Sequence, residues 1–327
     1  MGRWMAWRRM SDLDLGPNEF EQIQQLFRPL TRGAPEALGL LDDAAVIPSR
    51  PGFDLVVTKD VLVAGVHFLP GDPPDLIARK LLRVNLSDLA AKGAQPYGYF
   101  LGTAWSPDFG WPERQAFAAG LAVDGEAFDL RLLGGDTVST TGPLTISATM
   151  LGWVPSGKMV RRGGAREGDL IMVSGTIGDG GLAWLAALGE IADPEGEHQR
   201  RYRLPMPRVD LSAGLLDYAH AAADISDGLI ADCGHIATAS RVGIRLELDR
   251  IPLSSPTGAW LESQSDRQAG LLSLASLGDD YEIVCTAAPE VAAHLDMTVI
   301  GEVTRSGLII QIDGVTVSAG AGGWRHI

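Results

Sequence analysis

The apolar residues in the first half of the chain recur at two spacings, which predict alternating helices and strands. One group follows the three- and four-residue spacing of an amphipathic helix; its members are Phe20, Ile23, Leu26, Phe27 and Leu30. Further helices are expected at about 74–92, because two prolines precede this segment and Gly93 follows it, and at about 112–128. Short apolar runs predict strands at 44–47, 55–58, 97–105 and 144–154, and the Gly134–Gly135 pair predicts a turn.

A second α/β region is expected after residues 155–168, a segment rich in Gly, Arg and Lys that is typical of a linker. Helices are predicted at 182–188, at 209–222 and directly after the sequence ADISDG, and strands at 170–175, 243–248, 282–286 and 298–303, with a hairpin near 308–318. The predicted fold class is therefore α/β (α+β) in two domains, 17–154 and 155–327. Residues 1–16 lack a periodic apolar pattern and are expected to be a disordered extension, with Met10 the more natural beginning.

Composition excludes several classes of protein. The formal net charge of −14 over 327 residues argues against a nonspecific nucleic-acid binder, which needs basic faces. No run of about 18 apolar residues suggests a membrane span, so a cytoplasmic protein with neither nucleic acid nor membrane as partner is expected. Cys233 and Cys285 lie in small, apolar surroundings that favour buried free thiols over a disulfide.

Several well-known catalytic motifs are absent from the sequence. It has no G-x-x-x-x-G-K-[ST] phosphate loop, no H-R-D or D-F-G motif of protein kinases, and no G-x-S-x-G elbow of serine hydrolases. The glycine-rich segment TIGDGG before a predicted helix could present N–H groups to an anion. It could equally be an ordinary strand-to-helix turn.

Aspartates stand repeatedly at the predicted ends of strands and helices, often among apolar or very small residues. They are Asp42, Asp43, Asp60, Asp88, Asp136, Asp224, Asp227, Asp279 and Asp280. Each has a structural alternative, such as a helix cap at Asp227 or a surface ion pair between Asp88 and Lys92. Gathered in one place, however, carboxylates repel one another unless a cation is present, and Mg²⁺ prefers oxygen ligands. The set as a whole therefore predicts magnesium binding.

Seven sequence blocks resemble those of one enzyme family. In order, they are DDAAV, TKDVLVAGVHF, ARKLLRVNLSDLAAKGAQP, GGDT, GDLIMVSGTIGDGGLAW, DISDGLIADCGHIA and GDDYEIV. Over residues 19–327 the chain resembles the thiamine-phosphate kinases, within the superfamily that includes aminoimidazole ribonucleotide synthetase and selenophosphate synthetase. The resemblance implies the two-domain fold of that superfamily and a homodimer in which the N-terminal mixed sheets of two subunits pair into a barrel.

The resemblance also implies an activity and a set of site residues. The activity would be direct transfer of the γ-phosphoryl group of ATP to thiamine phosphate without a phosphoenzyme, assisted by several Mg²⁺ ions, with a monovalent cation such as K⁺ left open. The residues that match the family's metal ligands are Asp43, Thr58, Asp60, Asp88, Asp136, Asp224 and Asp227, the last also expected to be catalytic. ATP contacts are expected from Gly135, Arg162 and Ser226, and thiamine-phosphate contacts from His67, Asp279 and Trp324.

Three positions depart from the family pattern. Leu41 stands where glycine is usual, Asp279 where glutamate is common, and Lys59 replaces a hydroxyl residue beside Asp60. Lys59 could contact phosphate, replace a cation or point away into solvent. Two other functions remain open: a ligase similar to aminoimidazole ribonucleotide synthetase, and a non-catalytic ATP-binding maturation factor of the same superfamily.

Overall fold

The computed structural model describes residues 17–318, which form two compact units. The first unit runs to Asn85 and also contains Pro96–Trp153; the second contains Leu86–Gln95 and the chain from Val154 onward. Trp324 and the predicted N-terminal extension lie outside the described residues. Within 17–318, no helix combines the length and the apolar character that crossing a membrane requires.

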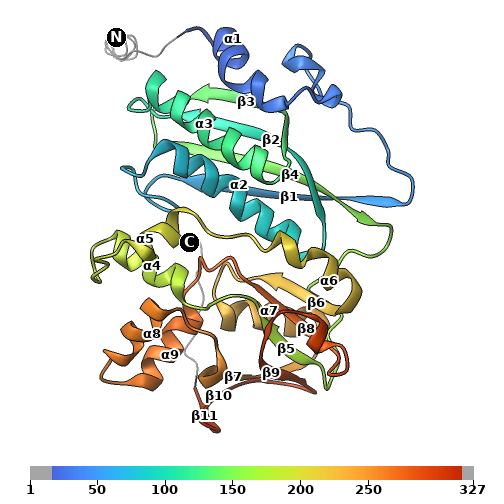
Figure 1. Ribbon diagram of the computed structural model, residues 1–327, viewed down its shortest axis with the longest axis vertical. Coiled ribbons are helices and arrows are strands. Elements are labelled where there is room, and N and C mark those ends of the chain that lie inside the picture. Colours follow the sequence, from blue (N-terminus) through green and yellow to red (C-terminus); the bar gives the residue numbers. More distant parts are fainter. Residues whose placement is uncertain (1–16, 319–327) are drawn as a thin grey trace, which may run out of the picture. The chain divides into compact units, whose positions relative to one another are not determined.

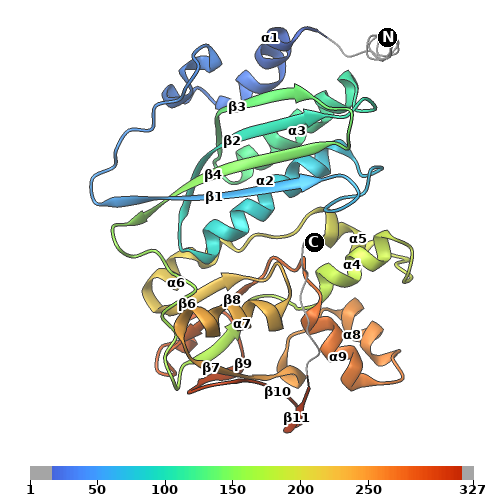
Figure 2. The same ribbon diagram turned by 180° about the vertical axis from the view of Figure 1, so that it is seen from behind.

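The first unit is built on a four-stranded sheet with one covered and one open face (Figures 1 and 2). Its strands, in the spatial order β1-β4-β2-β3, are β1 (Phe53–Val63), β4 (Thr145–Pro155), β2 (Gln95–Trp105) and β3 (Arg131–Ser139). Helices α2 (Pro74–Ala91) and α3 (Trp111–Ala127), both predicted from the sequence, lie against one face. Strands β1 and β3 are therefore the two edges of the sheet.

Aromatic packing joins the covered face of this sheet to α3. The ring of Trp105 stacks on Phe109 at 5.2 Å between centroids and meets the edge of Phe117 at 5.5 Å. Behind this layer, the buried Asp124 carboxylate accepts hydrogen bonds from Arg83 and Arg79 at 2.6 and 3.0 Å, so the charge buried between α2 and α3 is compensated.

Two local predictions for the first unit were wrong. Residues 44–47 lie in a loop, because the N–H of Val46 bonds to Glu36 instead of to a neighbouring strand. The Gly134–Gly135 pair is not a turn but the middle of β3, which pairs in parallel with β2. The first predicted helix is helical but irregular: α1 (Glu19–Gln22) continues as a π turn to Phe27 and a 3₁₀ turn over Arg28–Thr31, where Pro29 interrupts the α-helical bonding pattern.

The second unit has a seven-stranded mixed sheet with helices on both faces (Figure 1). In spatial order the strands are β11 (Val315–Val317), β10 (Leu308–Ile312), β7 (Gly243–Glu247), β9 (Thr298–Thr304), β5 (Leu170–Val173), β8 (Ile283–Ala287) and β6 (Ala219–Asp224). The α-helices are α4 (Asp179–Ala187), α5 (Glu197–Arg203), α6 (Ser212–Tyr218), α7 (Leu229–Ser240), α8 (Ser255–Glu262) and α9 (Arg267–Ser276).

Two apolar layers sandwich this second sheet. The larger contains residues of α7, α9 and one face of the strands, and the smaller contains Cys285 and Leu215 together with Ala90 and Ala91. These two alanines are the last residues of α2, so the C-terminal end of that helix packs as part of the second unit. Cys233 and Cys285 are both buried and free, as predicted.

The helix predicted at 209–222 is shorter than expected, since α6 ends at Tyr218 and residues 219–224 form β6. The sequence AHAAAD has no β-branched or aromatic residue to indicate a strand. The predicted hairpin near 308–318 is confirmed as β10 and β11.

Candidate functional site

A cavity of about 490 Å³ in the first unit brings together three of the predicted site residues. Asp43 reaches it from the loop after the 3₁₀ segment Pro35–Leu40, and Gly135 and Asp136 reach it from β3. Both aspartates are exposed. Among the described residues that line the cavity there are four carboxylates and neither lysine nor arginine, so its lining favours a cation or a ligand that arrives with one.

The shape of this wall depends on Gly135. A Cβ at this position would collide with the backbone carbonyl of Leu101 on β2, so only glycine lets β3 lie this close. The pairing of β3 with β2 also shifts by one residue between Tyr99 and Phe100, and such a bulge changes the direction of the side chains that follow. The residues after Leu133, including Asp136, are therefore placed by an irregular strand.

Thr58 and Asp60 lie on β1, at the other edge of the same sheet. Two strands separate β1 from β3, and neighbouring strands lie about 4.8 Å apart, so the two edges are about 14 Å apart. Within one chain, Thr58 and Asp60 therefore do not join Asp136 in a single coordination sphere. Lys59 points to the opposite face from Thr58 and Asp60, where its Nζ lies 3.4 Å from the hydroxyl of Thr149.

His67 closes the turn that follows β1. Its Nδ1 accepts a hydrogen bond of 3.1 Å from the N–H of Val63, which places the proton of the neutral ring on Nε2. Its carbonyl accepts a bond of 2.9 Å from the ammonium of the buried Lys80. The backbone around His67 is thus fixed from both sides.

In the second unit, backbone hydrogen bonds join two loops that carry predicted site residues. The N–H groups of Asp279 and Tyr281 bond to the carbonyls of Ser226 and Ile225, both at 2.9 Å. Asp279 and Tyr281 have φ of 64° and 51°, a left-handed backbone that costs energy for residues other than glycine. This paired arrangement holds Ser226, Asp227 and Asp279 close together.

Lys92 was not predicted as a site residue. It links the three segments that carry the predicted site residues Asp88, Arg162 and Asp224. Its Nζ donates a bond of 2.9 Å to the carbonyl of Ala222, two residues before Asp224, and its own carbonyl accepts from the N–H of Val160 at 3.2 Å. Burial lowers the pKa of Lys92, while the charges of Asp224 and Asp88 raise it and that of Arg162 lowers it. Asp88, Asp224 and Arg162 therefore share one electrostatic environment in this unit.

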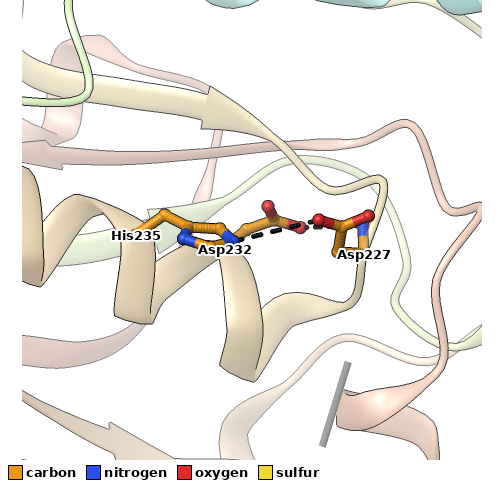
Figure 3. A group of neighbouring side chains, drawn as sticks. All are labelled: Asp227, Asp232 and His235. Atoms are coloured by element: carbon orange, nitrogen blue, oxygen red, sulfur yellow. Dashed lines mark hydrogen bonds and ion pairs between the residues drawn. The ribbon is translucent and has the colours of Figure 1, made fainter. Parts of the chain in front are cut away.

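Asp227 has two further neighbours, Asp232 and His235, on α7 (Figure 3). The N–H of Asp227 donates to Oδ2 of Asp232 at 3.1 Å, and Nε2 of His235 lies 3.8 Å from Oδ2 of Asp227. Burial raises the pKa of Asp232 to about 7, and the charge of Asp227 acts in the same direction. Asp232 and His235 are three residues apart on a predicted helix, and this spacing places both on one face of the helix. The sequence therefore contained a signal for these two neighbours of Asp227.

The glycine-rich turn TIGDGG already binds a carboxyl group that belongs to the chain itself. The N–H groups of Gly178 and Gly180 donate to the two oxygens of the buried Asp280 carboxylate, each at 2.8 Å. These two donors are thus directed at the protein's own carboxylate. The alternative interpretation, an ordinary strand-to-helix turn, fits the structure better than an external anion site.

Comparisons with known proteins agree with this fold. Residues 41–154 match the family model "AIR synthase related protein, N-terminal domain", and residues 166–313 match "AIR synthase related protein, C-terminal domain". The chain is 54% identical over 320 residues to a thiamine-monophosphate kinase of Caulobacter vibrioides, a match that covers 95% of this chain and 91% of the relative. The chain belongs to the thiamine-monophosphate kinase family.

Solved structures of the thiamine-monophosphate kinase family have the same architecture. The enzyme from Stenotrophomonas maltophilia is 36% identical, with a TM-score of 0.77 and coverage of 91% of this chain and 98% of that one. A structure described as "AaThiL complexed with AMPPCP and TMP" is 31% identical, also with a TM-score of 0.77, and covers 86% of this chain and 89% of that one. The predicted two-domain fold and family membership are therefore confirmed.

The ligand roles within this family's fold remain predictions for the present chain. The structure brings Asp43, Gly135 and Asp136 to one cavity and Ser226, Asp227 and Asp279 to one pair of loops. It also puts Asp88, Asp224 and Arg162 around Lys92. The residues that sequence reasoning left unassigned are Lys92, Asp232 and His235.

Proposed function

We propose that this protein transfers the γ-phosphoryl group of ATP directly to thiamine phosphate, giving thiamine diphosphate and ADP. The observation that carries the proposal is the 54% identity to a thiamine-monophosphate kinase across 95% of the chain. The related complex with AMPPCP and TMP supports it, since AMPPCP has the charges of ATP but a carbon bridge that resists cleavage. Neither alternative, the ligase or the maturation factor, has an observation of this strength.

Atoms balance in a single displacement. A phosphate oxygen of thiamine phosphate forms a bond to the γ-phosphorus, and the bond from that phosphorus to the β–γ bridging oxygen breaks, leaving ADP. Such a reaction depends mainly on positioning the two phosphates in line and on neutralising their charge. Arg162 is exposed and presents a guanidinium suited to bidentate phosphate contacts, while Gly135 is exposed in the wall of the first-unit cavity.

The acceptor is expected to contact His67 and Asp279. Thiamine carries a cationic thiazolium ring, for which the carboxylate of Asp279 is a suitable partner. Oδ1 of Asp279 accepts a bond of 3.1 Å from the Tyr281 hydroxyl, which restricts its orientation. The left-handed backbone at both residues is the kind of local strain found at ligand sites.

Several Mg²⁺ ions are part of the proposal. When bound, they would supply positive charge that neutralises the triphosphate. The residues fit this role: Asp43 and Asp136 line a cavity whose described lining includes no basic side chain. In the second unit, the charges of Asp88 and Asp224 both act on Lys92, and Asp227 lies beside Asp232.

A homodimer would explain why the carboxylates of the first unit lie at opposite sheet edges. If two sheets of order β1-β4-β2-β3 close edge to edge into a barrel, β1 of one copy lies beside β3 of the other. The strand that carries Asp60 in one copy would then lie beside the strand that carries Asp136 in the second. The open face of the sheet, where Val57, Val61 and Val138 are exposed, would become the barrel interior. Sedimentation at micromolar concentration should give a dimer, and a monomer would contradict this part.

The stereochemistry of transfer tests the mechanism. With ATP made chiral at a γ-thiophosphate by oxygen isotopes, one direct displacement inverts the configuration at phosphorus in the thiamine diphosphate analogue formed. Overall retention would require an even number of transfers and hence a phosphoenzyme, which would contradict the proposal. Addition of EDTA should abolish product formation, and full activity in EDTA would contradict the role of the metal ions.

A further inference from the structure

Three side chains converge where helix α7 begins, and all belong to one continuous segment of nine residues (Figure 3). Asp227 precedes the helix, Asp232 lies in its first turn and His235 one turn later. One ligand atom from each lies within 4.8 Å of the others. This spacing is close enough for the three atoms to contact one ion after small side-chain rotations.

Asp232 has an incomplete set of hydrogen bonds. Its side chain is fully buried, its Oδ2 accepts the N–H of Asp227, and the N–H of Ser226 also lowers the pKa of this carboxyl group. Among the described residues, however, no donor makes a hydrogen bond of normal geometry to Oδ1. A buried carboxylate oxygen without a partner is costly and uncommon. In Figure 3 this carboxylate lies between the imidazole of His235 and the carboxylate of Asp227.

Helix capping accounts for only part of this arrangement. A cap explains the bond from the Asp227 N–H to Oδ2, but it uses neither Oδ1 nor the imidazole. The partial positive charge of a helix N-terminus, about half an elementary charge, opposes a cation there. The two carboxylates outweigh it, even with the charge of Arg162 acting on Asp232.

We propose that Asp227, Asp232 and His235 form a binding site for a divalent transition-metal ion that accepts an imidazole ligand, with Mn²⁺ as its representative. Two carboxylates and one imidazole nitrogen suit Mn²⁺, Fe²⁺ or Zn²⁺, whereas Mg²⁺ prefers oxygen ligands alone. The inference rests on the proposed role of Asp227 as a metal ligand and extends it to two residues that the resemblance left unassigned. It predicts that one metal position of this protein discriminates among divalent ions through His235.

Electron paramagnetic resonance of Mn²⁺ tests this directly, with full-length, metal-free protein and neither ATP nor thiamine phosphate present. The wild-type protein should bind Mn²⁺ at a site whose electron spin-echo modulation shows a directly coordinated ¹⁴N. His235→Gln should remove that nitrogen coupling and weaken binding by at least the tenfold that loss of an outer-shell partner typically costs (about 10–100-fold). Because His235 is exposed, this variant should fold.

His294→Gln is the matched control, since His294 is an exposed histidine of the same unit that stacks on Tyr218. It should retain both the nitrogen coupling and the affinity. Asp232→Asn should also weaken binding, but if that buried substitution prevents folding, the His235 variant alone decides. Absence of ¹⁴N coupling in the wild type, its persistence in His235→Gln or its loss in His294→Gln would each overturn the inference.

The kinase activity and the metal site at His235 are tested by separate experiments, so either can be contradicted without the other. Thiamine diphosphate formation by the wild type with Mg²⁺ and without any Mn²⁺ tests the kinase activity alone. The resonance experiment contains no substrate, so its result holds whether or not turnover is observed.

Discussion

Two pairs of acidic residues have the same carboxyl chemistry but opposite environments. One pair, Asp43 and Asp136, belongs to the first-unit cavity, and the other, Asp280 and Glu282, belongs to the second unit. Asp43 and Asp136 are exposed and line a cavity in which the described residues offer no basic partner. Asp280 and Glu282 are fully buried, and hydrogen-bond donors surround both. The first pair has carboxylate oxygens available to an incoming ligand, whereas the second pair stabilises the fold by hydrogen bonds between distant segments.

Glu282 illustrates the structural class. Its carboxylate accepts from both Nε and Nη2 of Arg208 at 2.6 Å, from Arg201, and from the hydroxyl of Ser174 at 2.6 Å. These bonds anchor α5 and the segment before α6 to the start of β8. The comparison therefore separates acidic residues whose loss should reduce turnover from those whose loss should reduce stability.

The largest effect is expected for Asp136→Asn and Asp227→Asn. Either change removes a proposed metal ligand and should lower turnover by at least about 10²-fold, the typical cost of losing one preorganised electrostatic contact to a transition state. The melting temperature without nucleotide should stay constant or rise slightly, because repulsion between carboxylates decreases. Steady-state kinetics and thermal unfolding check both parts.

Asp129→Asn is the control for these variants, since Asp129 is an exposed aspartate of the first unit that pairs with Arg32 at the surface. It should leave turnover unchanged. Full activity of Asp136→Asn would contradict the assignment of Asp136 as a metal ligand. Unfolding of that variant would contradict the claim that this exposed aspartate has no structural role.

Glu282→Gln should destabilise the protein strongly. Removing one partner of a buried ion pair leaves the arginines without compensation, at a cost of about 3–5 kcal/mol in the free energy of unfolding. Glu247→Gln breaks a more exposed pair with Arg250 and should cost less than about 1 kcal/mol. Urea titration measures both, and equal effects would remove the distinction between buried and exposed acids.

Asp280 predicts a dependence of stability on pH. Burial raises its pKa from the ordinary 3.8 to about 8, against the two N–H bonds from Gly178 and Gly180. Between those values the folded state binds more protons than the unfolded state, so this group's contribution to stability is fully present below about pH 4 and is lost as the pH rises toward 8. The slope from one proton is at most about 1.4 kcal/mol per pH unit.

Asp280→Asn should flatten this pH dependence between pH 5 and 8. Asp266→Asn is the control, because Asp266 caps α9 through the N–H of Ala269 and asparagine caps equally well. Parallel pH profiles for the wild type and Asp280→Asn would mean that the two N–H bonds keep the carboxylate ionised throughout.

Lys59→Thr should have the smallest effect. The sequence left open whether Lys59 contacts phosphate or replaces a cation, but its side chain points to the sheet face opposite Asp60 and toward Thr149. The substitution should therefore leave the magnesium titration and the KM for ATP unchanged. A several-fold shift in either would place Lys59 at the metal site after all.

The sequence predicted the elements whose apolar pattern is regular, such as α2, α3 and β4. It could not predict β6, because a run of alanines carries no periodic signal, nor the strand through Gly134–Gly135, because the close approach of β2 that requires glycine is a tertiary contact. Seven blocks in order were enough to identify the family.

Within the candidate site, residue types were predictable but environments were not. Asp279 and Asp280 are neighbours in sequence, yet one lies in a strained loop beside Ser226 and the other is buried under a glycine turn. The sequence left open a surface ion pair between Lys92 and Asp88, whereas the partly buried Lys92 also donates its ammonium to the Ala222 carbonyl while the charge of Asp88 acts on it. Only three-dimensional packing separates these cases, since burial and hydrogen-bond partners come from distant segments.

The most direct measurement is product analysis with the purified full-length protein, MgATP and thiamine phosphate, with formylglycinamidine ribonucleotide as the acceptor in a parallel reaction. Chromatography should detect thiamine diphosphate and ADP in equal amounts in the first reaction and no nucleotide-dependent product in the second. ADP without thiamine diphosphate, or turnover of the ribonucleotide alone, would contradict the proposed function.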